Sequence, residues 1–156
     1  VPNGLRLTRR AASEIARAAG PRGMIGGQVL DLLLEKSSWC KDDLSLMHKM
    51  KTGALFEVSA TTGAILAGCD SSQVEAAASW GRLFGYAYQI IDDVEDSAKG
   101  GKEDSKNTFV KQLSREEALN KAARILRSSI EAVSSPGFTC SLLARLSNMY
   151  LEKIGE

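Results

Sequence analysis

Residues 88–96 read Tyr-Gln-Ile-Ile-Asp-Asp-Val-Glu-Asp and close the longest stretch of helical periodicity in the chain, residues 73–96. Successive residues of an α-helix advance by about 100°, so Asp92 and Asp96 share one helix face and Gln89 lies near it. Carboxylates this close repel one another unless a cation neutralises them. Oxygen ligands of this kind suit Mg²⁺, which proteins usually hold with one or two carboxylates together with substrate phosphates. The stretch therefore predicts a magnesium–phosphate site, with a solvated acidic helix end as the open alternative.

The composition indicates one globular domain. The 156 residues can bury a core, and the proportions of 44% hydrophobic and 25% charged residues are ordinary for such a domain. A net charge of +1 gives no reason to expect a nucleic-acid or membrane partner. No apolar run approaches the roughly 20 residues of a membrane span, and no signal peptide is recognisable. Three scattered cysteines and one histidine argue against a zinc site, a disulfide framework and a Cys–His nucleophile pair.

Helical periodicity covers almost the whole chain, and no segment shows the alternation of a strand. The expected helices are residues 7–19, 24–34, 42–67, 73–96, 114–133 and 138–154, with residues 1–6 as a lead-in and a short helical turn at 109–113. Ser72 with Glu75, and Ser114 with Glu117, have the spacing of capping boxes. We therefore expect residues 1–156 to form a single all-α domain.

The sequence Lys51-Thr52-Gly53 lies inside the expected helix 42–67. A glycine in the middle of a helix costs roughly 1 kcal/mol relative to alanine, so we expect a local distortion there. Backbone N–H groups freed beside an ammonium and a hydroxyl group would suit an anion. A solvated lysine beside a tolerated glycine is the alternative.

The apolar segment 24–34 carries two polar residues, Gln28 and Asp31, on one face. Polar groups in such surroundings need partners, which could be neighbouring helices or the contents of a polar cavity. Gly26 and Gly27 in the same segment would allow another backbone to approach closely.

A lysine-rich loop, residues 97–108, follows the acidic cluster, and its lysines could fold over an anion held there or remain solvated. A diphosphate with an apolar tail fits the carboxylates, Lys51 and this loop together. Mg²⁺ and lysines stabilise diphosphate as a leaving group, and the chain has no phosphate-binding GxxxxGK[ST] loop. The expected chemistry is ionisation of a carbon–oxygen bond instead of phosphoryl transfer.

Three segments closely resemble the trans-isoprenyl diphosphate synthases, in the family's order and at its separations. They are GMIGGQVLD at 23–31, HKMKTGAL at 48–55 and FGYAYQIIDDVED at 84–96. The match is to the short-chain type, the farnesyl and geranylgeranyl diphosphate synthases. The resemblance implies the all-α helical bundle of the isoprenoid (terpenoid) synthases, usually a homodimer. It also implies a Mg²⁺-dependent prenyltransferase of isoprenoid biosynthesis, in which an ionised allylic diphosphate alkylates isopentenyl diphosphate.

The resemblance also assigns roles to individual residues. Asp92, Asp93 and Asp96 correspond to the family's second aspartate-rich motif and become the expected Mg²⁺ ligands, with Asp92 first. Lys51, Thr52 and Gln89 are expected to hold the allylic diphosphate, and Lys51 and Asp92 are the expected catalytic residues. Further expected substrate contacts are the loop lysines Lys102 and Lys106 and, lining the cavity, Gln28 and Asp31.

Two features depart from the family pattern. The first aspartate-rich motif and the basic residues that bind isopentenyl diphosphate are absent, and the loop at residues 97–106 is shorter than usual. The family carries the absent parts in an N-terminal half, and this chain opens on Val1 without methionine. We therefore expect the C-terminal portion of a synthase, which binds diphosphate through one wall and does not catalyse condensation alone.

Two other functions remain open. The first is a non-catalytic regulatory small subunit of a heteromeric synthase, although the Cys-x-x-x-Cys motif common in such subunits is missing. The second is a head-to-head condensing enzyme of the squalene or phytoene synthase type, which the sequence Lys51-Thr52-Gly53 fits poorly. The expected location is the cytoplasm, or the plastid stroma in a plant or alga.

Overall fold

The computed structural model describes residues 2–34, 41–98, 113–135 and 138–156. The described helices are α1 (Pro2–Ala19), α2 (Met24–Leu34), α3 (Lys41–His48), α4 (Ala54–Leu66), α5 (Ser71–Ala98), α6 (Arg115–Ala132) and α7 (Ser141–Lys153). A π-helix, Lys49–Gly53, joins α3 to α4, and the two-residue strands β1 (Ser134–Ser135) and β2 (Phe138–Thr139) form an antiparallel pair. The predicted all-α fold class is confirmed.

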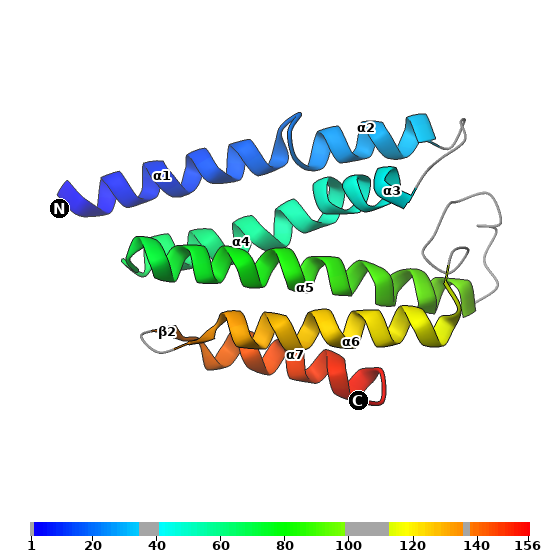
Figure 1. Ribbon diagram of the computed structural model, residues 1–156. Helices are drawn as coiled ribbons and strands as arrows, with labels where there is room; N and C mark the ends of the chain where they lie inside the picture. Colours follow the sequence, from blue (N-terminus) through cyan, green and yellow to red (C-terminus); the bar gives the residue numbers. More distant parts are fainter. Residues whose placement is uncertain (1, 35–40, 99–112, 136–137) are drawn as a thin grey trace.

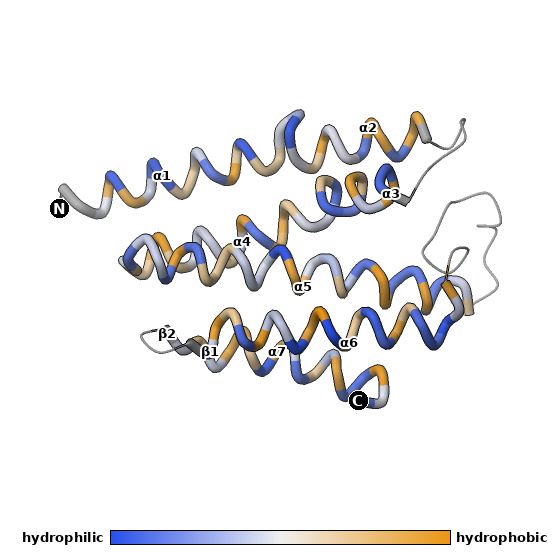
Figure 2. Tube along the Cα trace, in the orientation of Figure 1, coloured by the Kyte–Doolittle hydropathy of each residue, from blue (hydrophilic) through white to orange (hydrophobic). Residues whose placement is uncertain are grey.

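Helix α5 forms the centre of the bundle. It packs against α4 on one side and α6 on the other, while α1 covers α4 and α7 covers α6 (Figure 1). Polar and apolar residues alternate in short runs along the helices, as Figure 2 shows. Because α5 is covered from several directions, twelve of its residues are buried, which is typical of a central helix.

The core around α5 joins its aromatic residues to those of α4 and α7. Phe84 stacks on Trp80 at a centroid distance of 4.8 Å and meets Phe56 and Tyr150 edge-on at 5.3 and 5.2 Å. The Trp80 indole N–H donates to Ser147 Oγ at 3.0 Å. The buried hydroxyl groups of Ser147 and Ser129 are 2.8 Å apart, so α5, α6 and α7 share one satisfied polar cluster.

Several sequence predictions about the helices are confirmed. The expected distortion near Gly53 is the π-helix Lys49–Gly53, which interrupts the predicted helix 42–67. Ser114 and Glu117 form the predicted capping box, with Glu117 N–H donating to Ser114 Oγ and Ser114 N–H donating to Glu117.

Other boundaries were wrong. Helix α1 begins at Pro2 instead of Leu7, because proline is well suited to the first turn of a helix. Asp70 caps α5 instead of Ser72. Its carboxylate accepts from the Gln73 N–H group, the Ser72 hydroxyl group and the Ser72 N–H group, which lowers its pKa. In the last expected helix, 138–154, residues Phe138–Thr139 pair with β1, and α7 starts only at Ser141.

Two further observations concern parts of the sequence predictions. Residues 109–112 of the expected turn and residues 99–108 of the lysine-rich loop lie outside the described residues. Among the described residues, no helix is both long enough and apolar enough to cross a membrane.

Candidate functional site

The contact between α2 and the π-helix depends on Gly27. A Cβ atom at this position would lie 2.3 Å from the backbone nitrogen of Lys51 and 2.6 Å from its Cα, far inside van der Waals contact. Only glycine allows the two backbones this separation, which confirms the predicted close approach. Asp31, one turn further along α2, then lies beside the Lys51 side chain.

Lys51 and Asp31 form an ion pair, with 2.5 Å between Nζ and Oδ2. The Lys51 side chain remains about one-third exposed and that of Asp31 about one-sixth. The interpretation that Asp31 is bonded to a neighbouring helix is therefore confirmed. The charge of Lys51 is already compensated in the protein alone, and an anionic ligand would share or replace Asp31 as its partner.

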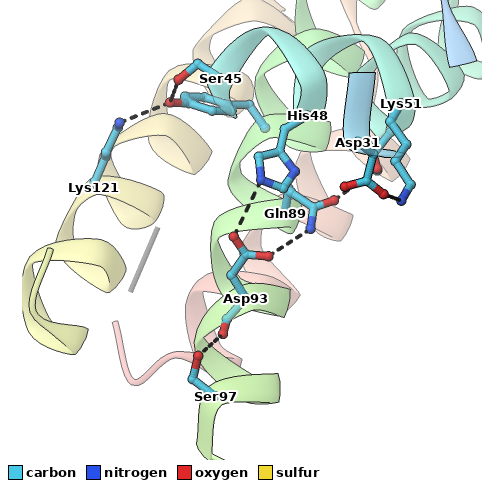
Figure 3. Close-up of polar contacts among 10 residues, drawn as sticks. Asp31, Ser45, His48, Lys51, Gln89, Asp93, Ser97 and Lys121 are labelled. Carbon is cyan, nitrogen blue, oxygen red and sulfur yellow. Dashed lines mark hydrogen bonds and ion pairs between the residues drawn. The ribbon is translucent and has the colours of Figure 1, made fainter. Parts of the chain in front are cut away.

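A second group of contacts begins at Thr52 and runs across α5. The Thr52 hydroxyl group donates to Gln89 Oε1 at 2.9 Å, and Gln89 Nε2 donates to Asp93 Oδ1 at 3.1 Å. The other carboxylate oxygen of Asp93 is 3.6 Å from Nε2 of His48. Figure 3 shows the imidazole, the carboxamide and the carboxylate turned toward one another between α3 and α5. The structure thus brings together Thr52 and Gln89, which the sequence predicted as substrate contacts.

His48 is the residue of this group that the sequence analysis did not assign to the site. Burial lowers its pKa to about 4, against the raising effects of the Asp31 charge and a hydrogen bond with Gln89. The imidazole is therefore neutral at pH 7. Its spacing in the sequence could have indicated this role. His48 precedes Lys51 by three residues and Thr52 by four, so the three residues fall on the same helical face.

The acidic side chains at the end of α5 lie on different faces of the helix. On an ideal helix Asp93 lies about 40° to one side of Gln89 and Asp92 about 60° to the other. Asp93 is accordingly buried against His48, whereas Asp92 and Asp96 are partly exposed. The Asp92 charge is the main cause that raises the pKa of Tyr88. Glu95 points to α7 instead, where it pairs with Lys153 at 2.6 Å.

The fit to a magnesium ion therefore concerns Asp92 and Asp96. No group of three or more His, Cys, Asp or Glu side chains suited to a metal occurs within the described ranges. Two partly exposed carboxylates one turn apart match the usual Mg²⁺ site, which takes its remaining ligands from water and substrate phosphates. Lys102 and Lys106 lie outside the described residues, so their assignments stay predictions.

A pocket of about 470 Å³ opens beside Lys51 and Thr52, within the size range of small-molecule sites. Its other lining residues are Met24 and Gln28 of α2 and Leu55, Phe56 and Ser59 of α4. Lys51, Thr52 and Gln28 thus supply polar groups to a pocket whose remaining lining is mainly apolar. This combination suits a ligand with a charged head and an apolar tail.

A family model described as polyprenyl synthetase matches residues 8–117. The chain belongs to the polyprenyl synthetase family. Geranylgeranyl pyrophosphate synthase 6, mitochondrial, of Arabidopsis thaliana is 39% identical over 99 residues, which cover 60% of this chain and 30% of that protein. Farnesyl diphosphate synthase of Geobacillus stearothermophilus is 34% identical over 96 residues, 62% of this chain and 32% of that protein.

Solved structures of prenyl-transferring enzymes have the same fold. An FPP/GFPP synthase from Zymomonas mobilis superposes with a TM-score of 0.82 at 29% identity and covers 92% of this chain and 51% of that one. A geranyltransferase from Helicobacter pylori, complexed with magnesium and isoprenyl diphosphate, gives 0.76 at 24% identity over 96% of this chain and 52% of that one. The resemblance inferred from the sequence is confirmed. The chain spans about half the length of these structures and about a third of the curated relatives.

Proposed function

We propose that this chain is the C-terminal part of a prenyl diphosphate synthase and holds the diphosphate of an allylic substrate. The whole enzyme would transfer the allylic group to isopentenyl diphosphate in isoprenoid biosynthesis. The observation that carries the proposal is the placement of Lys51 and Thr52 at an apolar pocket, with Gln89 accepting a hydrogen bond from the Thr52 hydroxyl group. Membership of the polyprenyl synthetase family supports it.

Each residue has a role that follows from its chemistry. Lys51 would donate charge-assisted hydrogen bonds to the diphosphate and stabilise the negative charge of the leaving group. Thr52 and Gln89 would orient the diphosphate beside Lys51, and Gln28 would contribute a further polar contact. Leu55 and Phe56 would exclude water from the allylic carbon while its bond to oxygen breaks.

Asp92 and Asp96 would hold Mg²⁺ together with the diphosphate. When bound, the ion supplies Lewis-acid stabilisation of the departing diphosphate, with Asp92 and Asp96 fixing its position. A direct contact of Asp93 with the ion would require its carboxylate to leave His48 and Gln89.

Calorimetric titration with geranyl diphosphate tests the proposed site in this chain itself. We expect binding that strengthens when Mg²⁺ is added, and a loss of at least tenfold for Lys51→Met, which removes a charged hydrogen-bond donor. Arg124→Met is the matched control, because Arg124 is an exposed cation on α6. Equal losses in the two variants, or no binding by the unchanged chain, would contradict the proposed site.

Chain elongation is a separate test. The 156-residue chain is assayed with geranyl and isopentenyl diphosphate beside a longer product that includes residues upstream of Val1. Activity in the longer product alone is the expected result, whereas equal activity in both would refute the division of the site between two halves. The alternative function, a non-catalytic regulatory subunit, predicts no Mg²⁺-dependent diphosphate affinity.

We also propose that the protein forms a homodimer. On α2, Ile25, Val29, Leu32 and Leu33 follow helical spacing and are each at least half exposed, which leaves an apolar stripe facing outward. Two relatives are named as large subunits of heterodimeric geranylgeranyl pyrophosphate synthases. Light scattering should give the mass of two chains, and Val29→Glu should give that of one. A monomeric unchanged chain would contradict the homodimer.

The compartment remains a proposal, namely the cytoplasm or the plastid stroma. Relatives carry names that place them in mitochondria or chloroplasts. Fractionation of source cells with an antibody to the chain would decide between these locations.

A further inference from the structure

We propose that His48 and Asp93 are positioning residues that hold Gln89, and through it Thr52, in place for the diphosphate. This inference rests on the proposed function and assigns Asp93 a role different from that of Asp92 and Asp96. According to this inference, Asp93 orients Gln89 on the side away from the pocket and does not bind the magnesium ion.

Burial separates Asp93 from the other two aspartates. Asp93 is 8% exposed and His48 is 7% exposed, and they meet between the end of α3 and α5. A carboxylate removed from water to this extent needs hydrogen-bond donors, and Gln89 Nε2 supplies one at 3.1 Å. The imidazole Nε2 faces the second carboxylate oxygen at 3.6 Å. Binding an ion in the solvent-accessible region would remove Asp93 from both groups.

The carboxylate determines which way the Gln89 carboxamide points. An ionised carboxylate only accepts hydrogen bonds, so it requires the NH₂ group of Gln89 on its side. The carboxamide oxygen is then directed at Thr52, whose hydroxyl group donates to it at 2.9 Å. Asp93 therefore selects one of the two orientations of the amide and fixes the Thr52 hydroxyl group at the edge of the pocket.

The neutral imidazole fixes the carboxylate in turn. Because Asp93 faces Nε2 of His48 and can only accept, the favoured tautomer carries its proton on Nε2. At 3.6 Å the contact is longer than a hydrogen bond, so the N–H favours the carboxylate electrostatically, and its loss would weaken the hold on Asp93 and through it on Gln89. The chain of contacts from His48 to Thr52 thus connects the end of α3 to the diphosphate site.

The chain contains a single histidine, so its imidazole nitrogens can be observed without assignment. Long-range ¹H–¹⁵N spectra of the metal-free chain at pH 7 should show a neutral imidazole protonated at Nε2. Asp93→Asn, which can donate toward Nε2, should shift the tautomer equilibrium toward Nδ1–H. Asp92→Asn is the matched control and should leave the imidazole signals unchanged. A wild-type imidazole protonated at Nδ1, or equal effects of the two variants, would overturn the proposal.

Geranyl diphosphate binding with and without Mg²⁺ distinguishes a positioning residue from a metal ligand. For Asp93→Asn we expect about tenfold weaker binding under both conditions, so that the gain in affinity from Mg²⁺ is unchanged. For Asp92→Asn that gain should collapse. If Asp93→Asn loses the magnesium gain as Asp92→Asn does, Asp93 is a metal ligand and the inference is wrong.

Amide substitutions at position 48 separate positioning from folding. His48→Gln places an N–H donor near the former Nε2 and should bind within about threefold of wild type, whereas His48→Asn, with a shorter reach, should bind about tenfold more weakly. Circular dichroism establishes that both variants are folded. Equal affinities of His48→Asn and wild type would refute the positioning role. An unchanged chain without diphosphate affinity would instead refute the proposed function, and the positioning role with it.

Discussion

Replacing Gly27 by alanine tests the contact on which the site is built. The new Cβ would lie 2.3, 2.6 and 2.8 Å from the N, Cα and Cβ atoms of Lys51, where ordinary contacts are 3.4–4 Å. Helix α2 or the π-helix must therefore move by about 1 Å, since the atoms in the way are mostly backbone and no side-chain rotation removes them. Overpacking of this kind costs about 1–3 kcal/mol. The helix propensity of alanine offsets roughly 1 kcal/mol of that cost.

The expected net result is destabilisation of Gly27→Ala by up to about 2 kcal/mol, measured as the free energy of unfolding in urea by circular dichroism. Gly63→Ala is the matched control, because a Cβ on Gly63 of α4 would meet no atom within 4 Å. The same substitution there should stabilise the protein by about 0.5–1 kcal/mol. The two variants thus differ in sign, although they make the same chemical change in a helix.

The same substitution should also affect the site, because a displaced π-helix moves Lys51 away from Asp31. Geranyl diphosphate affinity should fall in Gly27→Ala and stay at the wild-type value in Gly63→Ala. If Gly27→Ala unfolds at a higher urea concentration than wild type, as Gly63→Ala should, with an unchanged slope, then α2 does not pack on the π-helix as described.

Two further predictions concern buried polar groups. The folded-state pKa of His48, about 4, is below its ordinary value of 6.5, so the unfolded chain takes up the proton first. The free energy of unfolding should therefore fall by up to about 3 kcal/mol as the pH decreases from about 6.5 to 4. The His48→Gln variant should lack this part of the pH dependence when both proteins are measured in buffer that contains a chelator. Ser147→Ala should cost about 1–3 kcal/mol in urea unfolding, because the buried Trp80 N–H loses its acceptor. Ser128→Ala, an exposed neighbour on α6, should stay within about 0.5 kcal/mol, and equal effects of the two serine variants would contradict the buried cluster.

Local sequence determined much of the architecture. Helical periodicity gave the fold class, and the glycine of Lys51-Thr52-Gly53 indicated the interruption that became the π-helix. The capping box at Ser114 was readable for the same reason: its hydrogen bonds join residues three apart in the chain. Family motifs then placed Thr52 and Gln89 in one site, and these side chains do form a hydrogen bond.

Which of several neighbouring acidic residues is buried and which is exposed was decided only by the tertiary structure. Periodicity places Asp92, Asp93 and Asp96 at the end of one helix, but it does not say which neighbouring helix covers which face. Asp93 is buried against His48 at the end of α3, whereas Asp92 and Asp96 stay partly exposed. The pairing of Lys51 with Asp31 depends in the same way on a contact between segments twenty residues apart. The sequence shows how residues are distributed around the axis of one helix. Which of those side chains loses contact with water, and which partner it binds, depends on the neighbouring helix that packs against it.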